Sequence, residues 1–530
     1  MAQEDQTVSP VPTARQGKGD VERLHELGYA QELLRSMGGF SNFAVSFTMI
    51  SILSGCLTLY GFGMNTGGPV DMSSGWPLVG LMVVIVGLAM AEIASSYPTA
   101  GGLYYWSARL AGKNAPAWSW FTGWFNLLGQ VGVTAGIDFG LAFFVTAELN
   151  LVFGYPTDPP HVILVYAVVL FLHGLLNTFG VRLVAFLNDV SVWWHILGVL
   201  IIVAALALIP AHHQSAAFVF TRLVNNTGFK FPGAGIYVFL IGLLLAQYTF
   251  TGYDASAHMT EETREADVSA PWGIVMSIVV SLIAGWILLL GVTFAIQHYT
   301  AEATSPTGVP PAQIFIDAIG RVGGELLMLI VIGAQFFCGM SSVTANSRMI
   351  YAFSRDGALP ASSFWHRVNK RTRTPTNSIW LAAVGALILG LPYLWNSTAY
   401  AAVTSIATIG LYIAYAIPVL LRLRAGERFA RGPWHLGRWS KPIGIIAVLW
   451  VAFISILFVL PQVYPITLLT FNYAVVAVGI VVLFSGGWWI LSARRWFIGP
   501  RVQGTSEELA AIERELEAVG APEVATTPPA

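Results

Sequence analysis

The sequence contains little charge. Of its 530 residues only 10% are Asp, Glu, Lys or Arg, against roughly a quarter in an ordinary soluble domain, while 55% are hydrophobic and the mean hydropathy is +0.66. A soluble core does not account for such a composition. The 27 basic and 28 acidic residues leave a net charge of -1, so the basic surplus that a nucleic-acid binder needs is missing. The composition indicates an integral membrane protein without a nucleic-acid partner.

Cysteine and clustered metal ligands are scarce as well. The two cysteines, Cys56 and Cys338, lie in apolar stretches, and the ten histidines are scattered without the spacing of metal ligands. A membrane enzyme would need a clustered catalytic set, so we expect no enzyme, no metal and no cofactor. A sensor would need an attached soluble signalling domain, and a channel would be expected to have polar faces along several helices. These absences favour a carrier.

The two ends of the chain are polar. Residues 1–36 do not resemble a signal peptide, because the first long apolar run starts only near Phe43. We predict a cytoplasmic N-terminal segment, 1–41, with an amphipathic helix over Asp20–Met37, and a transmembrane domain, 42–492. The cytoplasmic tail, 493–530, is predicted to form a charged helix over Thr505–Val519 and then to be disordered.

Twelve apolar windows are long enough to cross a bilayer, which takes roughly 20 helical residues. The chain is therefore predicted to be an all-α integral membrane protein of twelve transmembrane helices. The predicted spans are Phe43–Met64, Trp76–Ser96, Ala117–Glu148, Val162–Phe179, Val190–Ile209, Gly233–Ala257, Pro271–Gln297, Glu325–Phe353, Asn377–Leu394, Ala399–Leu421, Ile443–Leu460 and Thr467–Leu491.

The distribution of basic residues orients these spans. With the N-terminus inside, all of the 27 Lys and Arg except Arg222, Lys230 and Arg321 fall in cytoplasmic segments. This bias matches the positive-inside rule, and one missed or invented helix would scramble it. We therefore expect a multi-pass protein of the cell membrane, in contact with membrane lipid, with both termini in the cytoplasm.

Two spans carry small and polar residues at mid-membrane. The first contains Ser51, Ser54 and Gly55, and the sixth contains Gly252 followed by Asp254. A broken helix exposes N–H groups at one half-helix end and carbonyls at the other, which suits a zwitterion. Breaks in the first and sixth spans are what an inverted five-helix repeat produces. The alternative is that the glycines only allow close helix packing.

Ionisable groups at membrane depth are costly and therefore suggest function. Asp254 could bind a substrate ammonium or take up a proton, or else cap the backbone of the broken helix. Asp138, deep in the third span, is a candidate for the far amine of an extended substrate, or else bonds a neighbouring helix. His195 could lend a positive charge where another carrier uses sodium. We expect His173 to be a packing residue.

Aromatic side chains bracket the second break. Tyr248, Phe250 and Tyr253 could close over a bound ligand, and their rings would hold a quaternary ammonium by cation–π attraction. Core packing is the alternative for each ring taken singly.

Four stretches resemble a known family. They are Leu27–Leu33 running into Phe43–Thr48, Ala91–Trp106, Trp120–Asn126 and Asn346–Pro360. On these stretches, from Glu26 to Leu491, the chain resembles the amino acid-polyamine-organocation superfamily, and within it the amino acid/choline transporter family of GABA, choline and related permeases. The resemblance implies a five-plus-five inverted repeat with broken helices 1 and 6, two added C-terminal helices, and secondary active transport by alternating access.

The resemblance also implies roles for residues at the breaks. Ser54 and Gly55, with the neighbouring Cys56, would offer backbone to the substrate carboxylate, although Leu53 stands where the superfamily often has the first glycine of Gly-Ser-Gly. Tyr248 would be an aromatic gate, and Asp254 would occupy the acidic position after the second break.

For the coupling ion, the resemblance offers two routes. Some relatives carry a lysine in the fifth span where His195 aligns, which implies a proton. Ser341 and Ser342 in the eighth span could face the first break and bind sodium instead.

The sequence as a whole predicts a proton-coupled importer of GABA or another small amino acid. A choline or polyamine permease with the same fold is the next alternative, and an amino acid antiporter or exchanger is a further one. The expected partners are a small-molecule substrate and a proton or sodium ion.

Overall fold

The computed structural model describes residues 19–179, 181–305, 308–396, 398–502 and 504–520. Within these ranges the chain is helical, apart from connecting loops and two isolated β-bridges. The all-α prediction is confirmed. The predicted disorder of the last residues lies outside the described part of the chain.

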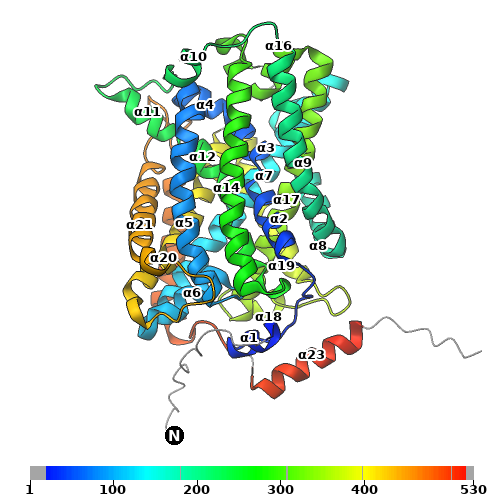
Figure 1. The fold of residues 1–530 in the computed structure, drawn as a ribbon, viewed down its shortest axis with the longest axis vertical. Coiled ribbons are helices and arrows are strands. Elements are labelled where there is room, and N and C mark those ends of the chain that lie inside the picture. Colours follow the sequence, from blue (N-terminus) through cyan, green and yellow to red (C-terminus); the bar gives the residue numbers. More distant parts are fainter. Residues whose placement is uncertain (1–18, 180, 306–307, 397, 503, 521–530) are drawn as a thin grey trace, which may run out of the picture.

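Eleven helices in the described residues are long and apolar enough to cross a membrane, and a shorter apolar segment, Ala234–Thr249, supplies the sixth of the predicted spans. The twelve spans thus lie where hydropathy placed them (Figure 1). In chain order they are α2 (Gly39–Ile50) with α3 (Ile52–Thr58) and α4 (Tyr60–Thr66), α5 (Trp76–Ser96), α7 (Ala115–Phe153), α8 (Pro159–Phe179), α9 (Val181–Leu208), α11 (Ala234–Gly242) with α12 (Leu244–Thr249) and α13 (Ala255–His258), α14 (Ala266–Phe294), α17 (Arg321–Arg355), α19 (Thr376–Gly390), α20 (Ala399–Ala425), α21 (Ser440–Leu457) and α22 (Ala474–Leu491).

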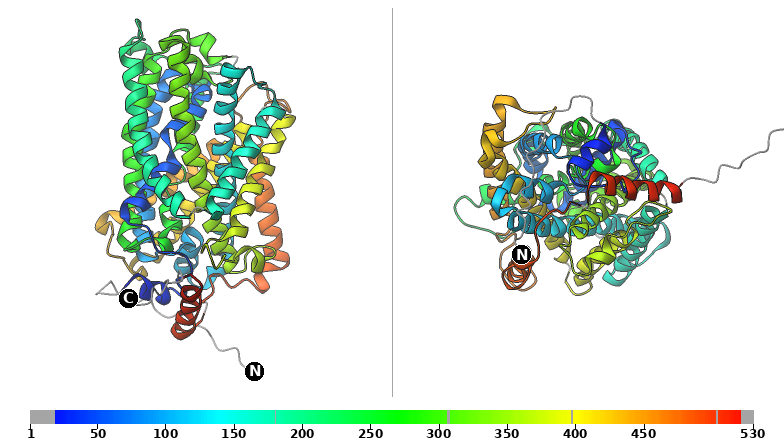
Figure 2. Two further views of the ribbon diagram at one scale, coloured as in Figure 1. Left: turned by 90° about the vertical axis from the view of Figure 1, so that its right-hand side faces the viewer. Right: turned by 90° about the horizontal axis from the view of Figure 1, so that it is seen from below.

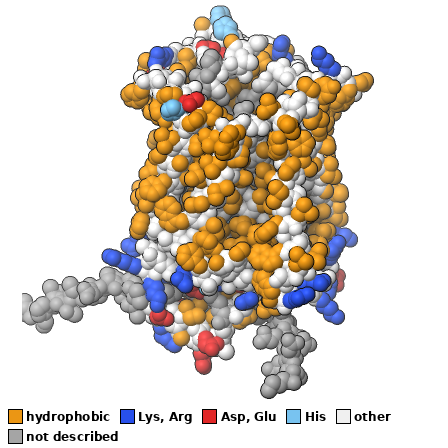
Figure 3. Space-filling view, turned by 180° about the vertical axis from the view of Figure 1, so that it is seen from behind, with side chains coloured by type: hydrophobic (Ala, Val, Ile, Leu, Met, Phe, Trp, Pro, Cys, Tyr) orange, Lys and Arg blue, Asp and Glu red, His pale blue; other side chains and the backbone are white. Residues whose placement is uncertain are grey.

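The outer surface of the bundle is apolar. Leucines and phenylalanines that would be buried in a soluble protein point outward, and Phe186, Leu200 and Leu449 are each about 60% exposed or more. Figure 3 shows this apolar belt around the middle of one face, with Lys and Arg side chains at its two ends. In hydrocarbon a helix satisfies its own backbone, so such a belt favours a lipid environment.

The packing of the spans follows the expected repeat. Helices that correspond in the two halves contact one another, α5 with α14, α7 with α17 and α8 with α19. The last two helices lie outside this arrangement, since α21 packs on α5 and α20, and α22 packs on α7 and α20. These contacts give each half the same neighbours, as an inverted repeat requires.

One end of the bundle carries the first and the last described helices and is called here the terminal face. The N-terminal helix α1 (Asp20–Glu26) is shorter than the predicted amphipathic helix, because residues 27–38 are irregular and bond to other segments. The predicted charged C-terminal helix is present as α23 (Ser506–Gly520) and lies across this end beside the N-terminal segment (Figure 2). His25 Nε2 and the N–H of Gln31 both contact Glu513, at 2.8 Å and 2.6 Å.

Shorter helices complete the two ends. At the terminal face α6 (Gly102–Ala111) packs under α7 and α20, and α18 (Ser362–Trp365) follows α17. The opposite end carries α10 (Ala216–Thr221), α15 (Tyr299–Ala303) and α16 (Pro310–Ile319).

Candidate functional site

The first span is broken at Ser51. This residue has a φ of +36°, a left-handed conformation that is rare for residues other than glycine, so α2 ends before it and α3 begins after it. A tertiary contact holds it there, because the Ser51 hydroxyl lies 2.7 Å from His195 Nε2 on α9.

The break leaves backbone donors free. Within the described chain, the N–H groups of Ile52 and Leu53 have no backbone acceptor. Those of Ser54 and Gly55 donate to the Ser51 carbonyl at 2.8 Å and 2.9 Å. The unpaired donors therefore belong to Ile52 and Leu53, whereas the resemblance had assigned this role to the backbone of Ser54 and Gly55, whose N–H groups are bonded here.

Gly55 serves a close approach between the two broken spans. A Cβ added there would lie only 2.5 Å from Thr249 Oγ1 and 2.8 Å from Thr249 Cβ, on α12. Because real Cβ atoms do not come so close to other atoms, a side chain at this position would push α3 away from α12. Cys56, the next residue, is fully buried on the same half-helix.

The sixth span is broken between Thr249 and Ala255. Gly252 has a φ of +92°, and a Cβ there would lie 2.6 Å from Met49 Cγ at the end of α2. Two tyrosines of α20 bond the open backbone: Tyr412 donates to the carbonyl of Phe250 at 2.9 Å, and the N–H of Gly252 donates to Tyr415 at 3.4 Å. The predicted break at Gly252 is present, and it faces the first.

The two half-helices nearer the terminal face are hydrogen-bonded to each other. Ser46 on α2 donates to the carbonyl of Tyr253 and accepts from the N–H of Ser256, both at 2.8 Å. Asn42 donates to the carbonyl of Ser256 at 3.0 Å. Below them the backbones of 37 and 262–264 pair, with Met37 bonded to Glu262 and Arg264 at 2.9 Å. We call α2 and α13, so joined, the paired half-helices.

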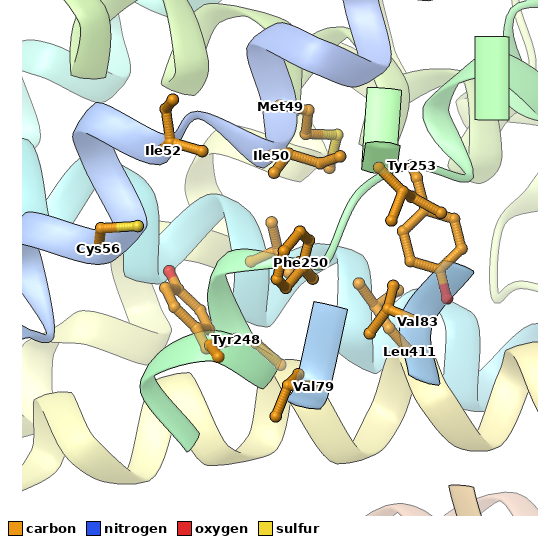
Figure 4. Close-up of a cluster of buried hydrophobic side chains, with 14 of the residues drawn as sticks. Met49, Ile50, Ile52, Cys56, Val79, Val83, Tyr248, Phe250, Tyr253 and Leu411 are labelled. Carbon is orange, nitrogen blue, oxygen red and sulfur yellow. The ribbon is translucent and has the colours of Figure 1, made fainter. Parts of the chain in front are cut away.

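Aromatic side chains fill the space at the second break. Phe250 and Tyr253 are fully buried and Tyr248 is nearly so, and Phe250 packs on Trp76 of α5 with ring centroids 4.4 Å apart. In Figure 4 Phe250 lies between the break in the first span and Val79, and the Tyr248 hydroxyl points toward α3, where Cys56 lies. The predicted gate residues thus surround the two breaks.

Asp254 is locked into a polar network. Its fully buried carboxylate accepts from Gln130 on α7 at 2.9 Å and from Tyr415 at 2.7 Å, and it lies 3.2 Å from His258 Nε2. The side chain makes no hydrogen bond that caps α13, so the capping alternative is not seen. Sequence reasoning missed Gln130 and Tyr415. The signal available for Gln130 was an amide in the middle of an apolar span, two turns before Asp138.

Asp138 lies elsewhere, between α7, α8 and α17. Its Oδ1 is 3.1 Å from His173 Nδ1, and both side chains are fully buried. The carboxylate packs against Gly339, and its charge acts on the Tyr248 hydroxyl. The alternative in which Asp138 contacts a neighbouring helix therefore describes its immediate surroundings. The partner on that helix is His173, which had been expected to be a packing residue.

The serines proposed for sodium are engaged in helix contacts. Ser341 donates to Asn188 on α9 at 2.5 Å, and Ser342 lies 2.8 Å from the hydroxyl of Thr134 on α7. Among the residues that the structure describes, no group of three or more His, Cys, Asp or Glu side chains could hold a metal ion.

Comparisons with known proteins agree with this geometry. The model of the amino acid permease family matches residues 37–483. The chain is 46% identical over 512 residues to the amino-acid permease BAT1 of Arabidopsis thaliana, covering 94% of this chain and 98% of that protein. It is 47% identical over 504 residues to a BAT1 homolog of Oryza sativa subsp. japonica, covering 91% and 96%.

A fungal relative is more distant. The GABA-specific permease of Saccharomyces cerevisiae is 31% identical over 526 residues, covering 96% of this chain and 89% of that protein. The family match runs through all but the end of the twelfth span and includes both breaks. The chain therefore belongs to the amino acid permease family, whose members are transporters and not enzymes.

Proposed function

We propose that this permease is a secondary active transporter that imports a small amine-bearing amino acid such as GABA, coupled to protons, by alternating access. The observation that carries the proposal is the pair of facing breaks. The free N–H groups of Ile52 and Leu53 would bind the carboxylate, and carbonyls released at the end of α12 would accept from the ammonium. Tyr248 and Phe250 would close over the bound substrate.

The choice of substrate rests on the relatives. Two of them are named as amino-acid permeases and one as GABA-specific. A choline or polyamine permease is the second candidate, because the rings of Tyr248, Phe250 and Tyr253 would also hold a quaternary ammonium. An amino acid exchanger would use the same site.

We place the terminal face in the cytoplasm of a cell membrane. Since Lys and Arg concentrate in the segments on that side, the positive-inside rule supports this orientation. Substrate would then enter from the opposite end and leave past the paired half-helices.

His195 links a proton to the first break. Its Nδ1 lies 2.8 Å from the carbonyl of Ser191, which can only accept, so Nδ1 carries a hydrogen. Nε2 of the neutral ring then accepts from the Ser51 hydroxyl at 2.7 Å. A proton on Nε2 would reverse this bond, and Ser51 would have to become the acceptor. The left-handed turn at Ser51 would thus respond to the protonation of His195. Asp254 is the other candidate for the coupling ion.

Uptake into proteoliposomes tests the proposal. Labelled GABA, choline, putrescine and a panel of amino acids are offered with and without an imposed proton gradient. We expect an amino acid to accumulate with the gradient, and His195→Gln to weaken the dependence on it. Asp254→Asn should abolish transport without loss of folded protein, because the amide can still bond Gln130 and Tyr415 but can neither take up a proton nor carry the negative charge. Accumulation of choline or putrescine alone would refute the amino acid assignment, and an unchanged pH profile for His195→Gln would remove the role of that residue.

A further inference from the structure

A second pair of titratable side chains lies inside the bundle, and the proposed mechanism does not use it. Asp138 on α7 and His173 on α8 are both fully buried, with Oδ1 and Nδ1 3.1 Å apart. In the described part of the chain no hydrogen bond reaches either carboxylate oxygen of Asp138 or either ring nitrogen of His173. Asp254, by contrast, has donors from two other helices.

The surroundings of this pair are dry and closely packed. A Cβ added to Gly339 on α17 would lie 1.8 Å from Asp138 Oδ1 and 2.6 Å from His173 Cε1, so α17 presses directly on both groups. The ring of Phe336, one turn earlier on α17, lies 4.5 Å from the imidazole. A water molecule between α17 and the pair therefore has no room.

The other titratable groups that face the pair are ordinarily uncharged at neutral pH. They are Tyr166 on α8, Tyr248 on α12 and Cys338 on α17, each of which interacts electrostatically with Asp138. Behind them, α19 contributes the ring of Trp380, which packs against Gly174. It also contributes the backbone carbonyl of Ala386, which accepts a hydrogen bond from Tyr166. The charge of Asp138 is thus left for His173 to balance.

Charge balance then depends on one proton. With a proton shared between them, Asp138 and His173 carry no net charge, whether the proton is on the imidazole or on the carboxyl group. Without it, a single negative charge is left in a buried, low-dielectric site where no described donor bonds the carboxylate, which is strongly unfavourable. The pair therefore retains a proton while it is enclosed, and can release it only when helix movement admits water.

The pair is also connected to both breaks. Cys338, adjacent to Gly339, donates from Sγ to the carbonyl of Met49 at the end of α2, at 3.2 Å. Tyr248, which precedes the second break, packs its hydroxyl against Gly136 on α7, two residues before Asp138, since a Cβ added to Gly136 would lie 2.4 Å from that oxygen. Movement at either break is therefore transmitted to the packing around the pair.

We infer that Asp138 and His173 together form a proton-binding site of the transport cycle, separate from the contact between His195 and Ser51. The inference rests on the proposed function, and it names the place where the co-transported proton is held. Asp138 then binds the proton, whereas the sequence had suggested that it binds the far amine of an extended substrate.

Two transport modes measured on the same proteoliposomes test this inference. Accumulation against a gradient requires proton release, whereas exchange of internal for external amino acid does not require the proton to leave. For Asp138→Asn we expect accumulation of labelled GABA or alanine, whichever the wild type takes up faster, to fall about tenfold or more, with exchange within about threefold of wild type. Asp158→Asn is the matched control, since Asp158 and His161 form the same kind of pair at an exposed position.

The outcomes separate the two proposals. The inference is overturned if Asp138→Asn accumulates substrate normally, or if accumulation by the wild type does not depend on the proton gradient. In either case, exchange by the wild type still supports the carrier function. A wild type that neither accumulates nor exchanges any amino acid refutes the proposed function itself. If Asp138→Asn loses both transport modes, His173→Gln is measured as a second variant. Retained exchange together with a shifted pH profile of accumulation supports the proton site. An unchanged pH profile, or the loss of both modes, shows that the pair has a structural role only.

Discussion

Replacing Gly55 by alanine should block transport through one steric contact. The new methyl group would meet Thr249 Oγ1 at 2.5 Å, Cγ2 at 2.7 Å and Cβ at 2.8 Å, and Thr249 belongs to a helix that cannot give way freely. Overpacking of this kind costs about 1–3 kcal/mol. Because α3 and α12 meet at this contact in the arrangement where the two breaks face each other, we expect the cost to fall on that arrangement, to which the proposed function assigns substrate binding.

The size of the effect follows from that energy. A penalty of about 1–3 kcal/mol on one conformation lowers its population relative to the alternatives by about five- to 150-fold. Initial uptake rate at low substrate concentration should fall by up to the same factor, because that rate depends on the fraction of molecules able to bind, and the full factor applies when the binding conformation is the minor one. Gly479→Ala is the matched control, since a Cβ on that residue of α22 meets nothing within 4 Å.

A second substitution checks the cause. Thr249→Gly removes all three atoms that approach the new methyl group, so the double variant should recover much of the activity despite about 0.3–0.5 kcal/mol of lost helix propensity. A double-mutant cycle measures this coupling directly. Uptake by Gly55→Ala equal to wild type, or a double variant no better than the single one, would refute the steric reasoning.

Two further predictions concern a buried ion pair and the two cysteines. Glu262→Gln leaves Arg348 buried without its 2.7 Å ionic partner, so the melting temperature in detergent should drop clearly, while Glu515→Gln, at an exposed pair, should leave it within error. Equal melting temperatures for the two variants would argue against a structural role for the buried pair. Cys56 and Cys338 are fully buried, so neither thiol should react with a membrane-permeant maleimide in the native protein. Both should react after denaturation in SDS. Rapid labelling of either thiol in the native protein would contradict the packing described.

The fold followed from the sequence because membrane spans are set by local composition. Hydropathy windows and the side preference of Lys and Arg depend on neighbouring residues alone, and they located the spans. The amphipathic helix was predicted too long for the same reason. Residues 27–38 have a helical pattern of apolar residues, but tertiary bonds to 262–264 and to α23 hold them in a non-helical conformation.

The exact geometry of the site could not be predicted, because distant helices determine it. Glycine was the natural candidate for the left-handed turn of the first span, yet Gly55 is required for close packing and the turn falls at Ser51, which His195 stabilises from α9. Likewise the partners of Asp254 come from α7 and α20, and no sequence spacing connects them. The second break was placed correctly because Gly252 itself adopts the positive φ.

The paired half-helices impose a condition on how the terminal face opens. Four hydrogen-bonding residues and a short backbone pairing join α2 to α13, so neither can tilt alone without breaking several buried bonds. The low-cost movement is a rotation of both as one rigid body. Its two pivots are the non-helical residues at Ser51 and at 250–254, where the backbone is already bent. A pair of spin labels, one on each half-helix, would then keep a constant separation throughout the cycle while both move relative to α7.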